Sequence, residues 1–176
     1  MIKTILFAAD LGVYTPFLLQ HVNDLAMGHG GNVVIIHAVE PAGEMAEAIV
    51  RAYLPELSRA ELEQDGRERV ARSIKARIVD MLEDEFMDGH DGLARVNDVR
   101  VGFGHPVSVI LDEARNCQAD LIVMGSHGHR SMNPALLGSV TSKVLQLSRV
   151  PVYMVPMVRE FSAETWLHGP SQRGVA

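Results

Sequence analysis

One stretch of the chain combines residue types and spacings that suit binding chemistry. An apolar run of strand length, residues 121–124, is followed by spaced glycine and hydroxyl residues: Gly125, Gly128, Gly138, Ser139 and Thr141. From residue 140 onward, apolar residues recur at helical spacing. Glycine lets the backbone pass close to a bulky ligand, and the N–H groups at a helix N-terminus favour an anion. The stretch therefore predicts a strand, a loop and a helix start that hold a phosphate.

The spacing Gly125-x2-Gly128-x9-Gly138-Ser139 resembles the G-2x-G-9x-G-(S/T) motif of ATP-binding universal stress proteins. The segments before and after the motif also fit this family, Asp120-Leu121-Ile122 and Val150-Pro151-Val152. The resemblance covers residues 1–157 and implies one universal stress protein domain there, followed by a C-terminal tail at 158–176. It also implies ATP as the cofactor, with Mg²⁺, and a nucleotide-dependent regulatory role in a stress response.

The same resemblance implies a set of nucleotide-binding residues in this chain. They fall at the ends of predicted strands and at the helix start. They are Ala8, Ala9 and Asp10 near adenine and ribose, Ala38 at the adenine, Met124, Gly125, His127 and Gly128 near ribose and phosphate, and Gly138, Ser139, Val140 and Thr141 at the phosphates. Leu11-Gly12 departs from the small polar residues that many members have after the aspartate. We predict no catalytic residue and no metal ion held by the protein alone.

Other chemistry for these residues is less well supported. His127 and His129 could contact a metal ion, but no third ligand accompanies them. His127-Gly128-His129 also resembles the H-x-G-H motif of nucleotidyltransferases. That motif, however, follows the first strand and has one residue between the histidine and the glycine. Asp10 could be a catalytic carboxylate, yet no second acid is visible near the loop, so ligand contact is favoured. No GxxxxGK[ST] sequence occurs, so a P-loop lysine is missing, and Ser126 and Ser139 have no evident triad.

The elements that must position this site alternate along the chain. Apolar runs predict buried strands at residues 2–8, 33–39, 95–101, 121–124 and 150–155, with helices between them. This alternation predicts an α/β fold with a five-stranded parallel sheet, helices on both faces and a ligand site beyond the C-terminal strand ends. The resemblance adds the strand order 3-2-1-4-5, a Rossmann-like fold of the adenine nucleotide alpha hydrolase-like type.

The segment between residues 40 and 92 fits the family least. We expect a short helix at 43–53 and a long amphipathic helix from about Ser58. Its apolar stripe is Val70, Ile74, Ile78, Met81, Leu82 and Phe86.

Composition narrows the class of protein further. Hydrophobic residues make up 47% of the chain and the formal net charge is −6, which argues against a nucleic-acid partner. No apolar run reaches the length of a membrane helix, and no signal-peptide pattern begins the chain, so we expect a cytoplasmic protein without membrane insertion. A single cysteine, Cys117, excludes an internal disulfide.

The last strand gives a prediction about assembly. Val150–Val155 is short, apolar and last in the sheet, and an uncovered edge of this kind tends to pair with a second chain. Many members of the family dimerise through this strand, so we expect a homodimer there, with an unknown regulatory protein as a further partner.

Two other functions stay open. The chain could be a family member that binds no nucleotide and acts through protein contacts, its glycines serving only tight strand–helix packing. It could also be a slow ATPase.

Overall fold

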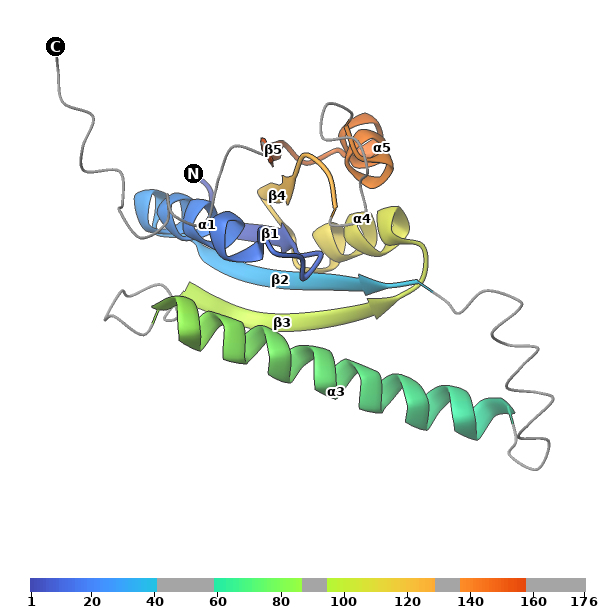
Figure 1. Cartoon of the computed structure of the whole chain (residues 1–176). Helices are drawn as coiled ribbons and strands as arrows, with labels where there is room; N and C mark the ends of the chain where they lie inside the picture. Colours follow the sequence, from blue (N-terminus) through green and yellow to red (C-terminus); the bar gives the residue numbers. More distant parts are fainter. Residues whose placement is uncertain (41–58, 87–94, 129–136, 158–176) are drawn as a thin grey trace, which may run out of the picture.

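The computed structural model describes residues 1–40, 59–86, 95–128 and 137–157. Its five strands form one parallel sheet in the order β3-β2-β1-β4-β5, as Figure 1 shows. This confirms the predicted α/β fold and its strand order. The strands are β1 (Thr4–Ala8), β2 (Asn32–Val39), β3 (Val96–Phe103), β4 (Leu121–Gly125) and β5 (Val152–Val155).

Helices cover both faces of the sheet. The helices are α1 (Thr15–His29), α3 (Arg59–Phe86), α4 (Pro106–Asn116) and α5 (Ser139–Leu147). One apolar cluster joins α1 and α3 to the sheet, and a second cluster joins α4 and α5 to the other face. The long α3 runs beside β3 and continues past the end of the sheet (Figure 1). Among the described residues, no helix combines the length and apolar character needed to cross a membrane.

The central strands are apolar throughout because both of their faces are covered. Phe7 of β1 is fully buried and stands between Ile35 of β2 and Val123 of β4. One residue later, Ala8 lies opposite both Ile36 and Met124. The C-terminal ends of β1, β2 and β4 therefore meet at one edge of the sheet, where the sequence predicted the ligand site.

Two of the differences from the sequence-based expectations concern β5 and α3. The fifth strand was expected from Val150, but β5 starts at Val152, because the Val150 N–H is taken by the Ser148 hydroxyl at 3.0 Å and Pro151 has no N–H. On α3, Ile78 and Leu82 are buried as predicted, whereas Val70 is 42% exposed. The expected short helix at 43–53 and the tail at 158–176 lie outside the described residues.

Candidate functional site

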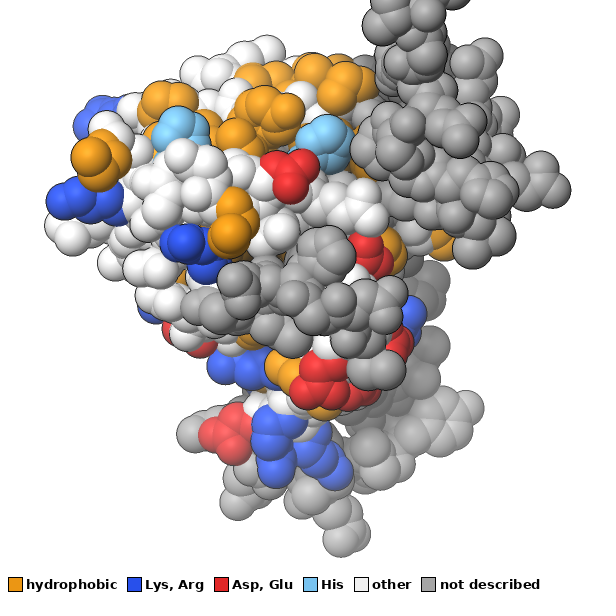
Figure 2. Space-filling model, turned by 90° about the vertical axis from the view of Figure 1, so that its left-hand side faces the viewer, with side chains coloured by type: hydrophobic (Ala, Val, Ile, Leu, Met, Phe, Trp, Pro, Cys, Tyr) orange, Lys and Arg blue, Asp and Glu red, His pale blue; other side chains and the backbone are white. Residues whose placement is uncertain are grey.

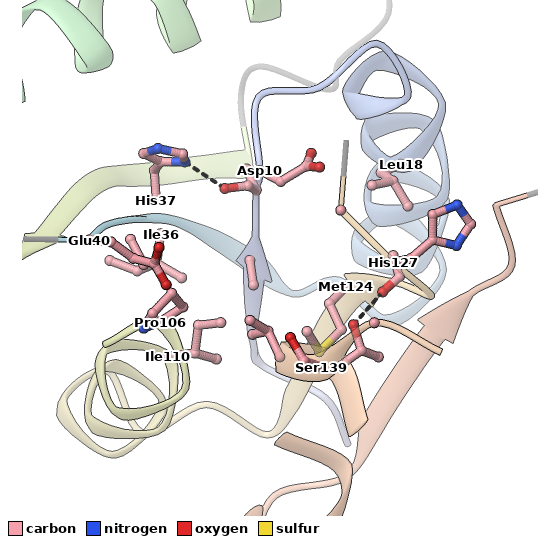
Figure 3. A pocket seen from close by; sticks show the side chains of 18 of the residues that line it. Asp10, Leu18, Ile36, His37, Glu40, Pro106, Ile110, Met124, His127 and Ser139 are labelled. Atoms are coloured by element: carbon pink, nitrogen blue, oxygen red, sulfur yellow. Dashed lines mark hydrogen bonds between the residues drawn. The ribbon is translucent and has the colours of Figure 1, made fainter. Parts of the chain in front are cut away.

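A cavity of about 880 Å³ opens at the edge where β1, β2 and β4 end (Figure 3). Residues from these strand ends, from the loop after β4 and from the starts of α4 and α5 form its walls. All of the residues predicted as a nucleotide site line this one cavity: Ala8, Ala9, Asp10, Ala38, Met124, Gly125, His127, Gly128, Gly138, Ser139, Val140 and Thr141. The fold thus brings the predicted set together, while their contacts with a ligand stay a prediction.

The β1 side of the cavity ends in a tight turn. The Asp10 carboxylate oxygen Oδ1 accepts a hydrogen bond from the Gly12 N–H at 3.0 Å and lies 3.5 Å from the buried Thr15 hydroxyl, which donates to it. Leu11 between them has a φ of 57°, in the left-handed region that leucine rarely adopts. The turn places Asp10 at the cavity wall, so the departure noted at Leu11-Gly12 coincides with an unusual backbone conformation.

The β2 side contributes backbone groups and one histidine. Regular β1–β2 pairing stops at Ala8 and Ile36, and the Ala9 N–H adds one more bond to the Ile36 carbonyl at 3.0 Å. His37 Nδ1 lies 2.7 Å from the Ala9 carbonyl oxygen. Alternate residues of a strand direct their backbone groups to the same neighbour. Ala38 therefore directs its N–H and C=O to the side of β1, beyond the point where β1 has ended.

Two hydrogen bonds fix the start of α5 against the end of β4. The Thr141 hydroxyl donates to the Gly125 carbonyl at 2.9 Å, and Thr141 is only 3% exposed. The Gly138 N–H donates to the Ser126 carbonyl at 2.9 Å. The Gly138 N–H and the Thr141 hydroxyl therefore each have a partner within the chain, and contact of either group with a phosphate stays a prediction. Within the described part of the chain, the backbone donors of this turn without a partner are those of Ser139, Val140 and Thr141.

The loop after β4 is tied to the segment that follows β5. Ser126 Oγ accepts a hydrogen bond from the Met157 N–H at 2.9 Å and lies 3.0 Å from His127 Nδ1. The Ser126 N–H donates to the Val155 carbonyl at 2.8 Å. His127 is buried, at 8% exposure, so its imidazole belongs to the packing of the loop. These bonds fix the position of the loop beside the cavity.

A side chain would meet different surroundings at each of the three glycines of the motif. A Cβ at Gly138 would lie 3.0 Å from the Cα of His127, and one at Gly125 would lie 2.3 Å from the Met157 sulfur. Tight packing therefore accounts for these two. A Cβ at Gly128 would meet only Asp10 Oδ2, at an ordinary 3.5 Å, within the described residues, and its φ is not in the left-handed range. Packing does not explain the third glycine in this part of the chain.

Most of the cavity lining is apolar, and the charged side chains among its described residues are acidic. Asp10 and Glu40 contribute carboxylates, and His37 and His127 contribute imidazoles. Of the described residues that line the cavity, none is lysine or arginine. The described residues also contain no group of three His, Cys, Asp or Glu side chains that could hold a metal ion. His129, the second histidine of the possible metal pair, lies outside the described residues.

Sequence reasoning missed the walls that come from α4 and from two apolar side chains of α1 and β2. Pro106 and Ile110 of α4 line the cavity, as do Leu18 of α1 and Ile36 of β2. The contribution of α4 could have been predicted from the topology, because a helix that follows a parallel strand begins at the edge of the sheet where that strand ends. No residue motif marks it.

Comparisons with known proteins agree with this architecture. A model of the Universal stress protein family matches residues 1–156. The chain is 30% identical over 155 residues to a universal stress protein of Thermus aquaticus, covering 88% of this chain and 99% of the relative. It is 25% identical to universal stress protein MJ0577 of Methanocaldococcus jannaschii over 155 residues, covering 88% and 95% of the two chains.

Solved structures give the same result. A structure of protein MJ0577 matches with a TM-score of 0.65 and 26% identity, covering 90% of this chain and 99% of that one. A structure of a universal stress protein in complex with cAMP matches with a TM-score of 0.55 and 19% identity, covering 89% and 98%. The second likeness concerns the fold alone.

Proposed function

The chain belongs to the universal stress protein family, and on that basis we propose that its cavity binds ATP. The protein then acts as a nucleotide-dependent regulatory module in a stress response. The observation that carries the proposal is the start of α5. Its first-turn residues Ser139, Val140 and Thr141 line the cavity, and their N–H groups have no partner among the described residues. Such donors, with the helix dipole behind them, favour the phosphates of a nucleotide.

Gly128 supports the same side of the proposal. It lines the cavity near Asp10, and the described residues give no packing reason for a glycine there. A missing side chain at this position leaves room for a phosphate to approach the backbone.

The adenine is assigned to the end of β2. Ala38 directs an N–H and a C=O toward the cavity beyond the end of β1, and adenine carries a matching acceptor and donor on one edge. Pro106 and Ile110 of α4 add an apolar wall for the flat face of the base. A mostly apolar pocket with a few convergent polar groups is typical of small-ligand sites.

Mg²⁺ fits the charge of the cavity. ATP brings several negative charges to a site whose described walls carry two carboxylates and no lysine or arginine. A divalent cation on the phosphates would offset that repulsion, and carboxylate oxygen is a ligand that Mg²⁺ accepts. The family resemblance placed Asp10 near adenine and ribose, but its carboxylate lies beside Gly128, so we assign Asp10 to the ion instead.

We expect hydrolysis to be slow or absent. Two hydrogen bonds to Asp10 Oδ1 come from the turn that follows it, which favours a structural and ligand-binding carboxylate over a general base. A turnover above about one per second would instead identify an ATPase, since typical enzyme rates begin there.

Analysis of the purified protein tests the proposal. Heat denaturation should release adenine nucleotide into the supernatant, or the emptied protein should take up ATP in a calorimetric titration with Mg²⁺. cAMP is the second ligand to titrate, because a protein of the same fold was crystallised with it. If neither ligand is released or bound, the family member that acts through protein contacts alone becomes the better account.

A homodimer through β5 is part of the proposal. β5 is the last strand of the sheet, and its Tyr153 and Met154 are 40% and 36% exposed. Figure 2 shows hydrophobic side chains gathered on the upper part of one face of the molecule. Pairing is confined to Val152–Val155, the residues between two prolines.

Sedimentation tests this interface. Wild type should be a dimer at micromolar concentration, and Tyr153→Lys should make it monomeric. Val79→Lys is the matched control, because Val79 is 41% exposed on α3, which packs beside β3 at the opposite end of the sheet. A monomeric wild type would rule out the interface. The cytoplasmic location and the absence of a nucleic-acid partner stay predictions.

A further inference from the structure

His37 lines the cavity and makes one contact that the nucleotide proposal does not use. Its Nδ1 lies 2.7 Å from the carbonyl oxygen of Ala9, as the dashed line in Figure 3 marks. A carbonyl oxygen only accepts hydrogen bonds, so Nδ1 must carry the hydrogen and donate it. The imidazole thus reaches from β2 to the first residue after β1.

This contact extends the pairing of β1 and β2 by one step. Regular pairing stops at Ala8 and Ile36. Ala9 is nevertheless held to β2 at both of its backbone groups, because its N–H donates to the Ile36 carbonyl and its C=O accepts from His37. A side-chain donor replaces the backbone donor that the next ladder position would have supplied.

The turn that follows Ala9 requires the backbone of Ala9 to be held in place. Leu11 adopts a φ of 57°, and conformations of this kind persist only when the surrounding structure enforces them. On the far side of Leu11, the Gly12 N–H and the Thr15 hydroxyl donate to Asp10 Oδ1. On the near side, the His37–Ala9 bond holds the chain.

We propose that His37 is a positioning residue for the nucleotide site: by holding the Ala9 carbonyl, it fixes the turn from Asp10 to Gly12 and so orients the Asp10 carboxylate at the cavity. Its effect on affinity rests on the proposed ATP binding. Its effect on the turn does not. The required feature is a donor at the position of Nδ1, and not the ring itself.

Three substitutions separate these features. His37→Asn keeps an N–H donor near the position of Nδ1, His37→Gln moves the donor outward, and His37→Leu removes it. His29→Leu is the control for a lost histidine, because His29 is exposed at the end of α1 and does not line the cavity. Each variant is first compared with wild type by its melting temperature, and His37→Gln serves if His37→Leu does not fold.

The readouts are the affinity for ATP with Mg²⁺, measured by calorimetry, and hydrogen exchange of the Gly12 amide in the ligand-free protein. We expect His37→Leu and His37→Gln to weaken ATP binding about tenfold, which is about 1.4 kcal/mol, and to speed Gly12 exchange. His37→Asn and His29→Leu should stay within about threefold of wild type in both.

Two results would overturn the role of His37 while leaving the proposed function intact: full affinity in His37→Leu, or equal losses in His37→Asn and His37→Leu. If wild type binds no nucleotide, the proposed function has failed. Hydrogen exchange of the Gly12 amide then tests whether His37 positions the turn. Faster exchange in His37→Leu and His37→Gln, but not in His37→Asn, supports the positioning role; unchanged exchange contradicts it.

Discussion

The Thr141 hydroxyl donates a 2.9 Å hydrogen bond to the Gly125 carbonyl, which ties the first turn of α5 to the last residue of β4. The Gly138 N–H makes a second tie, to the carbonyl of Ser126. Hydrogen bonds within the chain therefore position the start of α5 without the help of a ligand.

Thr141→Val should lower both stability and ATP affinity. Valine has nearly the same shape, but the Gly125 carbonyl loses its buried donor, which costs about 1–3 kcal/mol. Urea unfolding measures the stability and calorimetry the affinity. A variant as stable as wild type would show that this bond does not hold α5.

Ser139→Ala should separate binding from stability. Ser139 is exposed and its hydroxyl has no partner among the described residues, so the free energy of unfolding should change by less than about 0.5 kcal/mol. A hydrogen bond to a charged phosphate is worth about 1.5–3 kcal/mol, so ATP affinity should fall by at least about tenfold. An unchanged affinity would remove the Ser139 hydroxyl from the site.

Gly128 and Gly138 should respond differently to the same substitution. Gly138→Ala brings a Cβ within 3.0 Å of the His127 backbone, so it should reduce stability as well as ATP affinity. Gly128→Ala meets only ordinary contacts in the described chain and should reduce affinity alone. Melting temperatures and calorimetry of the pair test this. Full ATP affinity in Gly128→Ala would show that a side chain at this position does not hinder the ligand.

Asp120 should make stability depend on acid pH. The N–H groups of Lys3 and Thr4 donate to its carboxylate at 2.7 and 3.0 Å and hold the pKa of this carboxyl below its ordinary value. A lowered folded-state pKa gives stability that is fully present above the unfolded pKa of about 3.9 and is lost as the pH falls through the folded value. The melting temperature of Asp120→Asn should therefore lie below that of wild type at pH 7, and the two should converge below about pH 4. A gap that stays constant with pH would contradict this linkage.

The sequence predicted most of the fold because its signals are local. Near-continuous apolar runs such as residues 33–39 indicate strands covered on both faces, and their alternation with helices implies a parallel sheet. The strand order came from the family resemblance, since periodicity does not say which strands are neighbours. Val70 follows the apolar period of α3, yet it is 42% exposed, because burial depends on what a helix packs against.

The site was predictable where a motif marks it and not where packing creates it. The glycine spacing led to the start of α5. The walls from Pro106 and Ile110 arise from the way α4 packs on the sheet, which no short pattern records. The left-handed Leu11 and the His37–Ala9 bond depend on contacts between β1 and β2, so they became visible only in the structure.

Calorimetric titration of the nucleotide-free wild-type protein with ATP and Mg²⁺ tests the central claim most directly. We expect one ATP to bind per chain, and a hundredfold excess of ATP over its Kd to stabilise the fold by about 2.7 kcal/mol. No heat of binding and no stabilisation at millimolar ATP would contradict the account.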